Sequence, residues 1–507
     1  MSSLSRLLNA ATVIAVLAAL GPAASADVVE QGVKDSSPSG LLAGVAKVSI
    51  NPAVGIPHQN WGSATHIAAK HIDPVGLFMR ALVLSDGKRK FALVDVDSLF
   101  AGDGVERASE LTGIPVAHIR IGSSHTHAGP ALNRNKGPAG ADLTRYDRMM
   151  DSHRAVLADK LAGVIVEAHS RLRPAHAYGM TGTGSINVNR RFRGGGTVDG
   201  PPAVGLNFEG FVDRELPVIR IDDSDGNPYA ILVNFQAHGT VLAYENQTVS
   251  ADWMGSMRST VEKSLPGSTC LFFQGTAGDQ GPIEGFTGDL RVAHRLGRIL
   301  GHEAAAVALR ISTVRREPVF EGYVQSTALQ AKQPYRVQGP HDATLRYASK
   351  ILDLPRRVIA QEDIDRMTAL TADAKRKLVA VKQAGGGEWE QYQAAARHRR
   401  WSGLLARYQE PADPTPVKLE VAVLRIGGMA MVLTNGEMFA GIGAAVKKAS
   451  PFKLTMFCGY GNRTGGGYMP TKPEYAFGSY EVDRTSYAPE AAEIVIKETI
   501  ALLKSVR

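Results

Sequence analysis

Apolar runs of strand length alternate along this chain with longer amphipathic stretches, and the alternation predicts a mixed α/β fold. The short runs are rich in β-branched and other apolar residues. The longer stretches repeat apolar residues at helical spacing. Strands are predicted at residues 44–50, 91–96, 119–124, 229–235 and 269–273, helices at 151–171, 289–309 and 489–506, and a hairpin at 419–433 that turns at Gly427-Gly428. We expect one large catalytic domain over residues 41–507, with mixed β-sheets flanked by helices.

Two segments depart from this alternation. Residues 181–205, from Thr181 to Gly205, are rich in Gly, Pro and Arg, and they predict a long loop of the kind that often lines a site. Residues 363–408 are rich in Lys, Arg, Ala, Glu and Gln, and Gly385-Gly386-Gly387 interrupts them. They predict two charged helices, which form a solvated helical insertion at about residues 355–410.

The first 26 residues have the pattern of a signal peptide. Arg6 precedes an apolar run from Leu7 to Leu20, and Ala24-Ser25-Ala26 supplies small residues at the cleavage positions. The run is shorter than the roughly 20 residues that a bilayer-spanning helix needs, which disfavours a membrane anchor. We therefore predict a secreted or periplasmic protein in which residues 27–40 form a linker before the catalytic domain.

Composition and charge narrow the classes of partner. The chain is 44% hydrophobic and 21% charged, which is typical of a globular protein. Its net charge of +8 is dispersed, apart from Lys375-Arg376-Lys377 and Arg397-His398-Arg399-Arg400. Without a basic strip interleaved with aromatic residues, we expect no nucleic-acid partner, and at most a weak peripheral contact with an anionic membrane surface. The oligomeric state stays open, and Cys270 and Cys458 fit one buried disulfide or two free thiols equally well.

A His-Thr-His motif follows the predicted strand at 119–124. Residues two apart in an extended chain point to the same side, so His125 and His127 can face one pocket. Gly129-Pro130 then ends the strand beside them. By itself, such a pair fits a metal site and two ordinary polar histidines about equally.

Two later polar side chains also follow apolar runs. His238 comes after the run 231–235, and Glu437 comes after the run that ends at Leu433. Taken singly, His238 is typical of a structural histidine and Glu437 of an exposed loop residue. Because functional groups gather where the strands of a parallel or mixed sheet end, the three segments together point to one site. Two His and one Glu form a sound zinc ligand set that leaves a position for water.

Short blocks along most of the chain resemble the neutral/alkaline ceramidases. The resemblance runs from Gly44-Val45-Ala46-Lys47 to the final helix. Its further blocks are Ser124-His125-Thr126-His127-Ala128-Gly129-Pro130, Asn189-Arg190, His238-Gly239-Thr240, Ser250-Ala251-Asp252, Ala277-Gly278-Asp279, Asn435-Gly436-Glu437, Gly459-Tyr460-Gly461-Asn462, Tyr468, Glu474-Tyr475 and Tyr480-Glu481. Each block is short, but their common order argues against a chance match.

The resemblance implies a role for each of several residues. The residues that would hold one zinc ion are His125, His238, Glu437 and Tyr468. His127 and Tyr480 would hydrogen-bond the substrate carbonyl or the oxyanion formed from it, and Arg190 would lie near the scissile group. Asp252 and Asp279 are candidates for orienting ligands or accepting a proton, and Asp279 equally fits the cap of a following helix or turn.

The chain departs from the family's pattern in three places. The family's Gly-Asp-Val-Ser-Pro block carries a serine regarded as essential for ceramide cleavage, whereas this chain reads Gly278-Asp279-Gln280-Gly281-Pro282. Gly281 has no hydroxyl, so no serine nucleophile or serine-held oxyanion can exist there. The stretch from Asn462 to Tyr468 is one residue longer. The chain ends at Arg507, where family members usually continue into a β-sandwich domain, so we expect no such domain here.

These observations lead to an exported zinc-dependent hydrolase that cleaves an N-acyl amide, with or without a lipid chain, by metal-activated water. A bound zinc ion lowers the pKa of its water to roughly 7 and polarises a carbonyl, and neither effect needs a serine. The alternatives are a zinc esterase for small acylated compounds and a ceramidase-like binding protein without activity. Retention of every proposed ligand argues against the binding protein.

Overall fold

The computed structural model describes residues 40–58, 61, 63–99, 103–131, 137–193, 202–411, 413–462 and 464–507. The predicted signal peptide, nearly all of the linker and part of the predicted loop at 181–205 lie outside the described residues. The chain divides into two units, Met1–Gly32 and Val33–Arg507, and every described residue belongs to the second. Among the described helices, none is long and apolar enough to cross a membrane.

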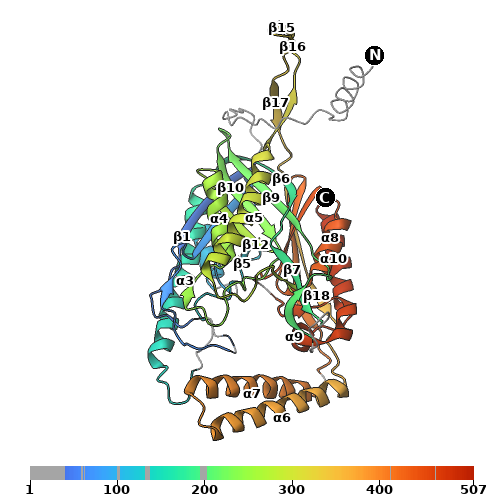
Figure 1. Cartoon of the computed structure of the whole chain (residues 1–507). Coiled ribbons are helices and arrows are strands. Elements are labelled where there is room, and N and C mark those ends of the chain that lie inside the picture. Colours follow the sequence, from blue (N-terminus) through green and yellow to red (C-terminus); the bar gives the residue numbers. More distant parts are fainter. Residues whose placement is uncertain are drawn as a thin grey trace, which may run out of the picture. The chain divides into compact units, whose positions relative to one another are not determined.

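An eight-stranded mixed sheet forms the centre of this unit (Figure 1), in the order β12-β10-β9-β6-β1-β3-β4-β5. Most neighbouring strands are antiparallel, but β4 and β5 pair in parallel, as do β10 and β12. The strands are β1 (Leu42–Ser49), β3 (Phe78–Ser85), β4 (Lys90–Val96), β5 (Ile119–Ser123), β6 (Arg173–Thr183), β9 (Glu215–Asp223), β10 (Pro228–Phe235) and β12 (Thr269–Gln274). Each of the five strands predicted from apolar runs is present.

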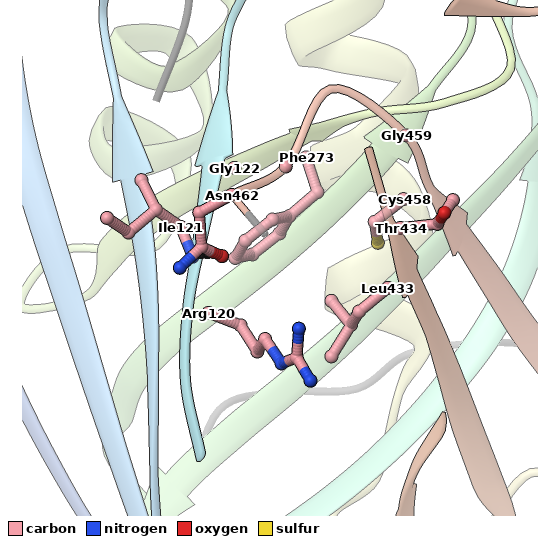
Figure 2. A pocket seen from close by; sticks show the side chains of 10 residues that line it. Arg120, Ile121, Gly122, Phe273, Leu433, Thr434, Cys458, Gly459 and Asn462 are labelled. Atoms are coloured by element: carbon pink, nitrogen blue, oxygen red, sulfur yellow. Dashed lines mark hydrogen bonds between the residues drawn. The ribbon is translucent and has the colours of Figure 1, made fainter. Parts of the chain in front are cut away.

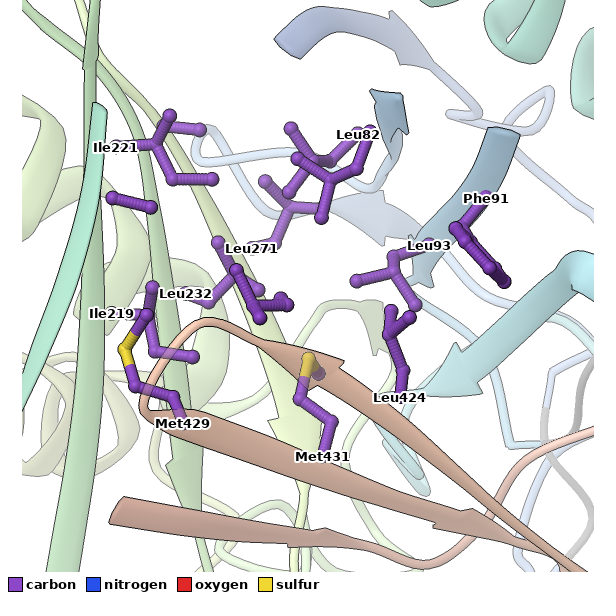
Figure 3. Packing of buried hydrophobic residues seen from close by; sticks show 14 of the residues in the cluster. Leu82, Phe91, Leu93, Ile219, Ile221, Leu232, Leu271, Leu424, Met429 and Met431 are labelled. Atoms are coloured by element: carbon purple, nitrogen blue, oxygen red, sulfur yellow. The ribbon is translucent and has the colours of Figure 1, made fainter. Parts of the chain in front are cut away.

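A second sheet of four strands packs against one face of the first. Its order is β18-β19-β20-β22, with β18 (Leu345–Leu354), β19 (Val417–Ile426), β20 (Met429–Thr434) and β22 (Leu454–Cys458). The strands β19 and β20 are the predicted hairpin, and β20 pairs with β22 in parallel. Figure 3 shows the core between the sheets, where Leu424, Met429 and Met431 lie with Leu232 and Leu271 of the larger sheet.

Helices cover the outer face of each sheet. Successive residues of a strand point to opposite faces, so Leu232 joins the core between the sheets while Ile231 and Val233 pack among residues of α4 and α5. Helices α2 and α3 pack on the part of the large sheet formed by β1, β3, β4 and β5, and α8 and α10 cover the small sheet. The bounds are α2 (Val105–Thr112), α3 (Thr144–Ser170), α4 (Trp253–Ser264), α5 (Leu290–Arg310), α8 (Ala440–Ala449) and α10 (Ala491–Ser505). This layering confirms the prediction of mixed sheets flanked by helices.

The charged insertion consists of two helices that lie side by side (Figure 1), α6 (Gln361–Gln383) and α7 (Glu388–Gln409). The predicted interruption is the turn between them, where Gly385 has a φ of 69°. Most residues of both helices are exposed or half-buried, but the pair does not stand free in solvent. Arg366 pairs with Asp483 at 2.6 Å, and the Tyr408 hydroxyl donates to the Asp483 carbonyl at 2.8 Å.

The prediction of one long loop at 181–205 is wrong for its described part. Strand β6 extends to Thr183, and β7 (Asn187–Phe192) and β8 (Ala203–Asn207) form a three-stranded sheet with β13 (Gln280–Pro282). The glycines here serve close packing. A Cβ at Gly182 would come within 2.3 Å of Val307, and a Cβ at Gly184 within 2.3 Å of Phe235. A glycine-rich composition was therefore misread as a loop signal.

Short elements complete the unit. The strand pairs are β2 (His71–Ile72) with β11 (Thr248–Val249), β14 (Val314–Pro318) with β17 (Tyr335–Pro340), β15 (Tyr323–Gln325) with β16 (Leu329–Ala331), and β21 (Glu437–Met438) with β23 (Tyr468–Met469). The part of the chain that the structure describes also contains two 3₁₀ helices, at Val116–His118 and Lys472–Phe477, and helix α9 (Ser479–Arg484). Of the two alternatives for the cysteines, the structure has free thiols, because Cys270 and Cys458 are both buried and unbridged.

Candidate metal and catalytic site

The candidate residues lie where strands of both sheets end. His125 and His127 follow β5, His238 follows β10, and Glu437 lies just beyond β20. The parallel bridge between Thr126 and Gly239 joins the first two segments directly. The structure therefore brings these three segments together, as the sequence analysis expected of them.

Three histidines form the centre of the site. The ring nitrogens that His125, His127 and His238 can offer to an ion all lie within 4.8 Å of one another. His125 has a φ of 59°, a left-handed conformation that is unusual for a residue with a side chain. Its amide donates to the Ser98 carbonyl at 2.9 Å and to the Ser123 hydroxyl at 3.0 Å, which holds this conformation in place.

Glu437 closes one side of the histidine cluster. One of its carboxylate oxygens lies 3.1 Å from Nε2 of His238 and 3.6 Å from Nε2 of His125. The opposite nitrogens bond to backbone carbonyls, Nδ1 of His125 to Leu99 at 2.8 Å and Nδ1 of His238 to Ala277 at 2.7 Å. Each Nδ1 therefore carries the proton, and each Nε2, which lies next to Glu437, is the nitrogen that can bind a metal ion.

Burial sets the protonation of these groups. It lowers the pKa of His125 and His127, and together with the nearby Arg190 it lowers the pKa of His238 to about 3. Burial alone would raise the pKa of Glu437, but His125 and His238 outweigh it and lower that pKa. At neutral pH the imidazoles are therefore neutral and the carboxylate is charged, which is the state that metal ligands require.

Tyr468 lies beside Glu437 because the short strands β21 and β23 pair in parallel with these two residues in register. The Tyr468 hydroxyl accepts a hydrogen bond of 3.1 Å from Nη2 of Arg190 in β7. Arg190 in turn pairs with Glu481 at 3.0 Å. The ring of Tyr480 lies 5.5 Å from that of Tyr468, centre to centre. The structure thus brings Arg190, Tyr468 and Tyr480 to the same site.

Two polar groups in the site have no hydrogen-bond partner among the described residues. Nε2 of His127 is buried and unpaired, and so is the hydroxyl of Tyr460. The Tyr460 ring lies 4.5 Å from the ring of His125, centre to centre. Buried polar groups are nearly always paired, so these two groups are available to contact a ligand. Tyr460 was not among the predicted site residues, although it stands in one of the blocks that carry the family resemblance.

Asp279 and Asp252 have structural partners. One oxygen of Asp279 accepts from the Ala440 amide at 2.7 Å, so this residue caps α8, a helix much later in the chain than the predicted one. Burial raises its pKa to about 7. Asp252 caps α4 by accepting from the Trp253 amide at 2.8 Å, and burial raises its pKa to about 6. A role for Asp279 in proton transfer stays a prediction.

Gly281 lies in β13, against Arg190. A Cβ built at this glycine would meet Cβ of Arg190 at 3.4 Å and Cδ at 3.9 Å, which are ordinary van der Waals distances. A serine therefore fits here without a clash. The position where the family has a serine is next to the guanidinium that contacts Tyr468.

A separate small pocket lies between β5 and the small sheet (Figure 2). Arg120, Phe273, Leu433 and Asn462 are among its lining residues. Arg120 is paired with Glu420 at 2.6 Å, and the Asn462 side chain accepts from the Ile121 amide at 3.0 Å. These contacts join the Gly459–Asn462 segment to β5, so Asn462 has a structural role behind the site.

The site residues fit a divalent ion of the zinc type. Neutral imidazole nitrogens and one carboxylate oxygen are the ligands that zinc takes in proteins, and the hydrogen bonds of Nδ1 to backbone carbonyls are typical of metal-binding histidines. His127 lies close enough to serve as a ligand as well, in place of its predicted role at the substrate carbonyl.

Residues 75–287 match the family model described as "Neutral/alkaline non-lysosomal ceramidase, N-terminal". The matched region contains His125, His127, Arg190, His238, Asp252 and Asp279. The other predicted site residues, Glu437, Tyr468 and Tyr480, lie beyond it.

Curated relatives and a solved structure agree with this match. The chain is 30% identical over 170 residues to neutral ceramidase B of Dictyostelium discoideum, which covers 33% of this chain and 22% of the relative. It is 29% identical over 178 residues to neutral ceramidase A of the same organism, covering 32% and 24%. The aligned segments thus span less than a quarter of these relatives. The crystal structure of the Pseudomonas aeruginosa neutral ceramidase superposes with a TM-score of 0.59 at 18% identity, over 93% of this chain and 75% of that one, and this shows a shared fold.

Proposed function

We propose that this chain, which belongs to the neutral/alkaline non-lysosomal ceramidase family, is an exported zinc-dependent hydrolase that cleaves an N-acyl amide bond. The observation that carries the proposal is the buried group of His125, His127 and His238 with Glu437 against it. Residues 41–507 would form the catalytic domain.

In this proposal His125, His238, Glu437 and Tyr468 hold one zinc ion. The bound ion supplies a Lewis acid and lowers the pKa of water. Support for Tyr468 comes from its place beside Glu437 and from the Arg190 guanidinium at its hydroxyl, which offsets part of the rise in the Tyr468 pKa that burial and Glu437 cause.

The remaining side chains bind the amide. Nε2 of His127, buried and unpaired, and the hydroxyl of Tyr480 hydrogen-bond the carbonyl oxygen of the substrate. Negative charge develops on that oxygen as water adds to the carbonyl carbon, and fixed donors stabilise it most at that point. Arg190 adds a positive charge that Glu481 and Tyr468 hold in a fixed position. The carbon–nitrogen bond then breaks, and the amine leaves with a proton.

The first prediction concerns metal content. Purified protein contains one zinc ion per chain, and His125→Ala or His238→Ala removes it, because each change deletes a ligand and opens the coordination shell. Elemental analysis after dialysis measures the zinc content of the wild type and of each variant. His302→Ala, an exposed histidine of α5, is the matched control and keeps the metal. Wild type without any transition metal would contradict the proposal.

His127→Ala separates the two roles open to His127. The variant keeps its zinc and loses turnover if His127 binds the carbonyl oxygen, whereas it loses zinc if His127 is a ligand. A hydrolase screen on ceramides, N-acyl amino acids and simple esters then identifies the bond that is cleaved. Turnover of esters alone would favour the esterase, and zinc-loaded protein without any activity would favour a binding protein.

A further inference from the structure

Two arginines lie against the ring of Tyr480. Cζ of Arg400, from α7, is 5.0 Å from the ring centre, and Cζ of Arg484, from α9, is 5.2 Å from it. Arg400 also contacts the indole of Trp401 at 5.1 Å. A guanidinium stacked on an aromatic face keeps its N–H donors, which point outward in its own plane, free for an anion.

Neither arginine has an ion-pair or hydrogen-bond partner among the described residues, and both are exposed. The other arginines of this region are neutralised. Arg190 pairs with Glu481 at 3.0 Å, Arg191 pairs with the same carboxylate at 2.6 Å, and Arg193 pairs with Glu474 at 2.6 Å. The positive charge beside Tyr480 is therefore left uncompensated.

The helical insertion is anchored so that Arg400 stays at this place. Near one end of α7, the Tyr408 hydroxyl donates to the carbonyl of Asp483, three residues after Tyr480. Toward the other end, the Gln393 amide donates to the Ser63 carbonyl at 3.0 Å. The Ser63 segment includes Trp61, whose indole donates to the carbonyl of His127 at 3.2 Å. Helix α7 thus spans from one side of the site to the other.

We propose that Arg400 and Arg484 form a subsite for an anionic oxygen group on the substrate, so that the preferred substrate is an N-acyl amine carrying a carboxylate or a phosphate. The inference rests on the proposed amide hydrolysis. Tyr480, which binds the carbonyl oxygen in that mechanism, is also the ring on which both arginines lie. In an N-acyl amino acid the carboxylate carbon is three bonds from the amide carbon, so one substrate can reach Tyr480 and the guanidinium groups together.

The test compares substrates that differ in charge alone. The wild type hydrolyses N-dodecanoylglycine with a kcat/KM at least about tenfold above that of N-dodecanoylglycinamide, since charge-assisted hydrogen bonds to the arginines form only with the carboxylate. In the double variant Arg400→Gln, Arg484→Gln this ratio falls to about one, mainly through KM. Arg399→Gln is the matched control, because Arg399 lies on the same helix but stacks on Tyr392, and it keeps the wild-type ratio. N-dodecanoyl phosphoethanolamine shows whether phosphate or carboxylate is preferred.

A binding measurement separates this inference from the proposed activity. Titration calorimetry uses ketone analogues of both substrates, in which CH₂ replaces the amide NH. The carboxylate analogue binds the wild type about tenfold tighter than its neutral amide, and the double variant loses the difference, whether or not any amide is cleaved. Equal affinities in the wild type would overturn the subsite, as would a carboxylate preference that survives in the double variant. If the double variant loses binding to phosphatidylserine vesicles but keeps the wild-type ratio of the two kcat/KM values, the arginines would instead bind a membrane surface.

Discussion

At the scale of single residues, we expect position 281 to determine how well this site cleaves ceramide. Gly281 removes a hydroxyl donor beside Arg190, and one such donor contributes roughly 2.7–4 kcal/mol of transition-state stabilisation in comparable sites. We expect ceramide to be a poor substrate, while amides or esters with a better leaving group are still cleaved. Kinetics of wild type and Gly281→Ser on ceramide and on an activated amide measure this.

We expect Gly281→Ser to leave the fold unchanged. Because a Cβ at position 281 meets Arg190 at no less than 3.4 Å, Gly281→Ser folds with unchanged zinc content. Any increase in the rate of ceramide hydrolysis is then caused by the added hydroxyl itself. Efficient ceramide turnover by the wild type would refute the idea that this glycine changed the specificity.

The raised pKa of Asp279 can be tested through the pH dependence of the free energy of unfolding. Its pKa is raised to about 7 in the folded protein from about 3.8 in the unfolded chain, so its contribution to stability is complete below pH about 4 and is lost as the pH rises through about 7. Asp279→Asn has no such proton but keeps an oxygen for the Ala440 amide. The free energy of unfolding of the variant relative to wild type therefore increases between pH 4.5 and pH 7.5, by a few kcal/mol at most. Urea denaturation at the two pH values measures this difference.

Turnover by the same variant decides between the two roles of Asp279. A helix cap predicts a kcat close to that of the wild type, whereas a residue that accepts a proton in the reaction predicts a loss of roughly 10²–10⁴-fold. Since both oxygens of Asp279 already accept hydrogen bonds, from Ala440 and from Asn189, we expect the smaller effect.

At the scale of elements, a buried ion network fixes α4 to the large sheet. Arg258 of α4 lies 2.7 Å from Asp95 and 2.8 Å from Asp97, and all three side chains are fully buried. Removing the arginine leaves two buried carboxylates with Arg80 as their remaining cation, 3.5 Å from Asp95 and 3.3 Å from Asp97. We expect Arg258→Met to lower the free energy of unfolding by about 3–5 kcal/mol, measured by urea denaturation.

Arg291→Met is the matched control for that experiment. Arg291 also pairs with an aspartate, Asp289, but its side chain is 92% exposed, so water screens the pair and we expect little change in the free energy of unfolding. Equal losses in the two variants would show that burial of the network is not what stabilises α4.

The elements differ in how far the sequence could predict them. Strands such as β10 and β12 have both faces covered, and their apolar runs were read correctly. β6 was missed because Gly182 packs against a helix, an arrangement that no local pattern encodes. The pairing of Glu437 with Tyr468 involves only two residues per strand, so Tyr468 could be predicted from the family resemblance alone. Tyr460 and the docking of Arg400 depend on tertiary contacts and were not predicted.

At the scale of the whole molecule, the export prediction has a direct measurement. The Ala24-Ser25-Ala26 pattern predicts that mature protein begins at Asp27. N-terminal sequencing of protein recovered outside the cytoplasm identifies the first residue. Recovery there of chains that still begin at Met1 would contradict the prediction, and a chain cut at another small residue would correct the cleavage position.

The candidate site residues lie far apart in the sequence, so the ribosome synthesises them at different times. His125 and His238 leave the ribosome early, whereas Glu437 and Tyr468 are among the last seventy or so residues to be made. If these four residues hold zinc as proposed, a nascent chain carries two histidines without the carboxylate and the phenol that complete the site, and it would hold zinc only weakly. Metal uptake would then be the last step of maturation. For an exported chain, the zinc supply of the compartment where folding finishes then determines how much of the protein is active.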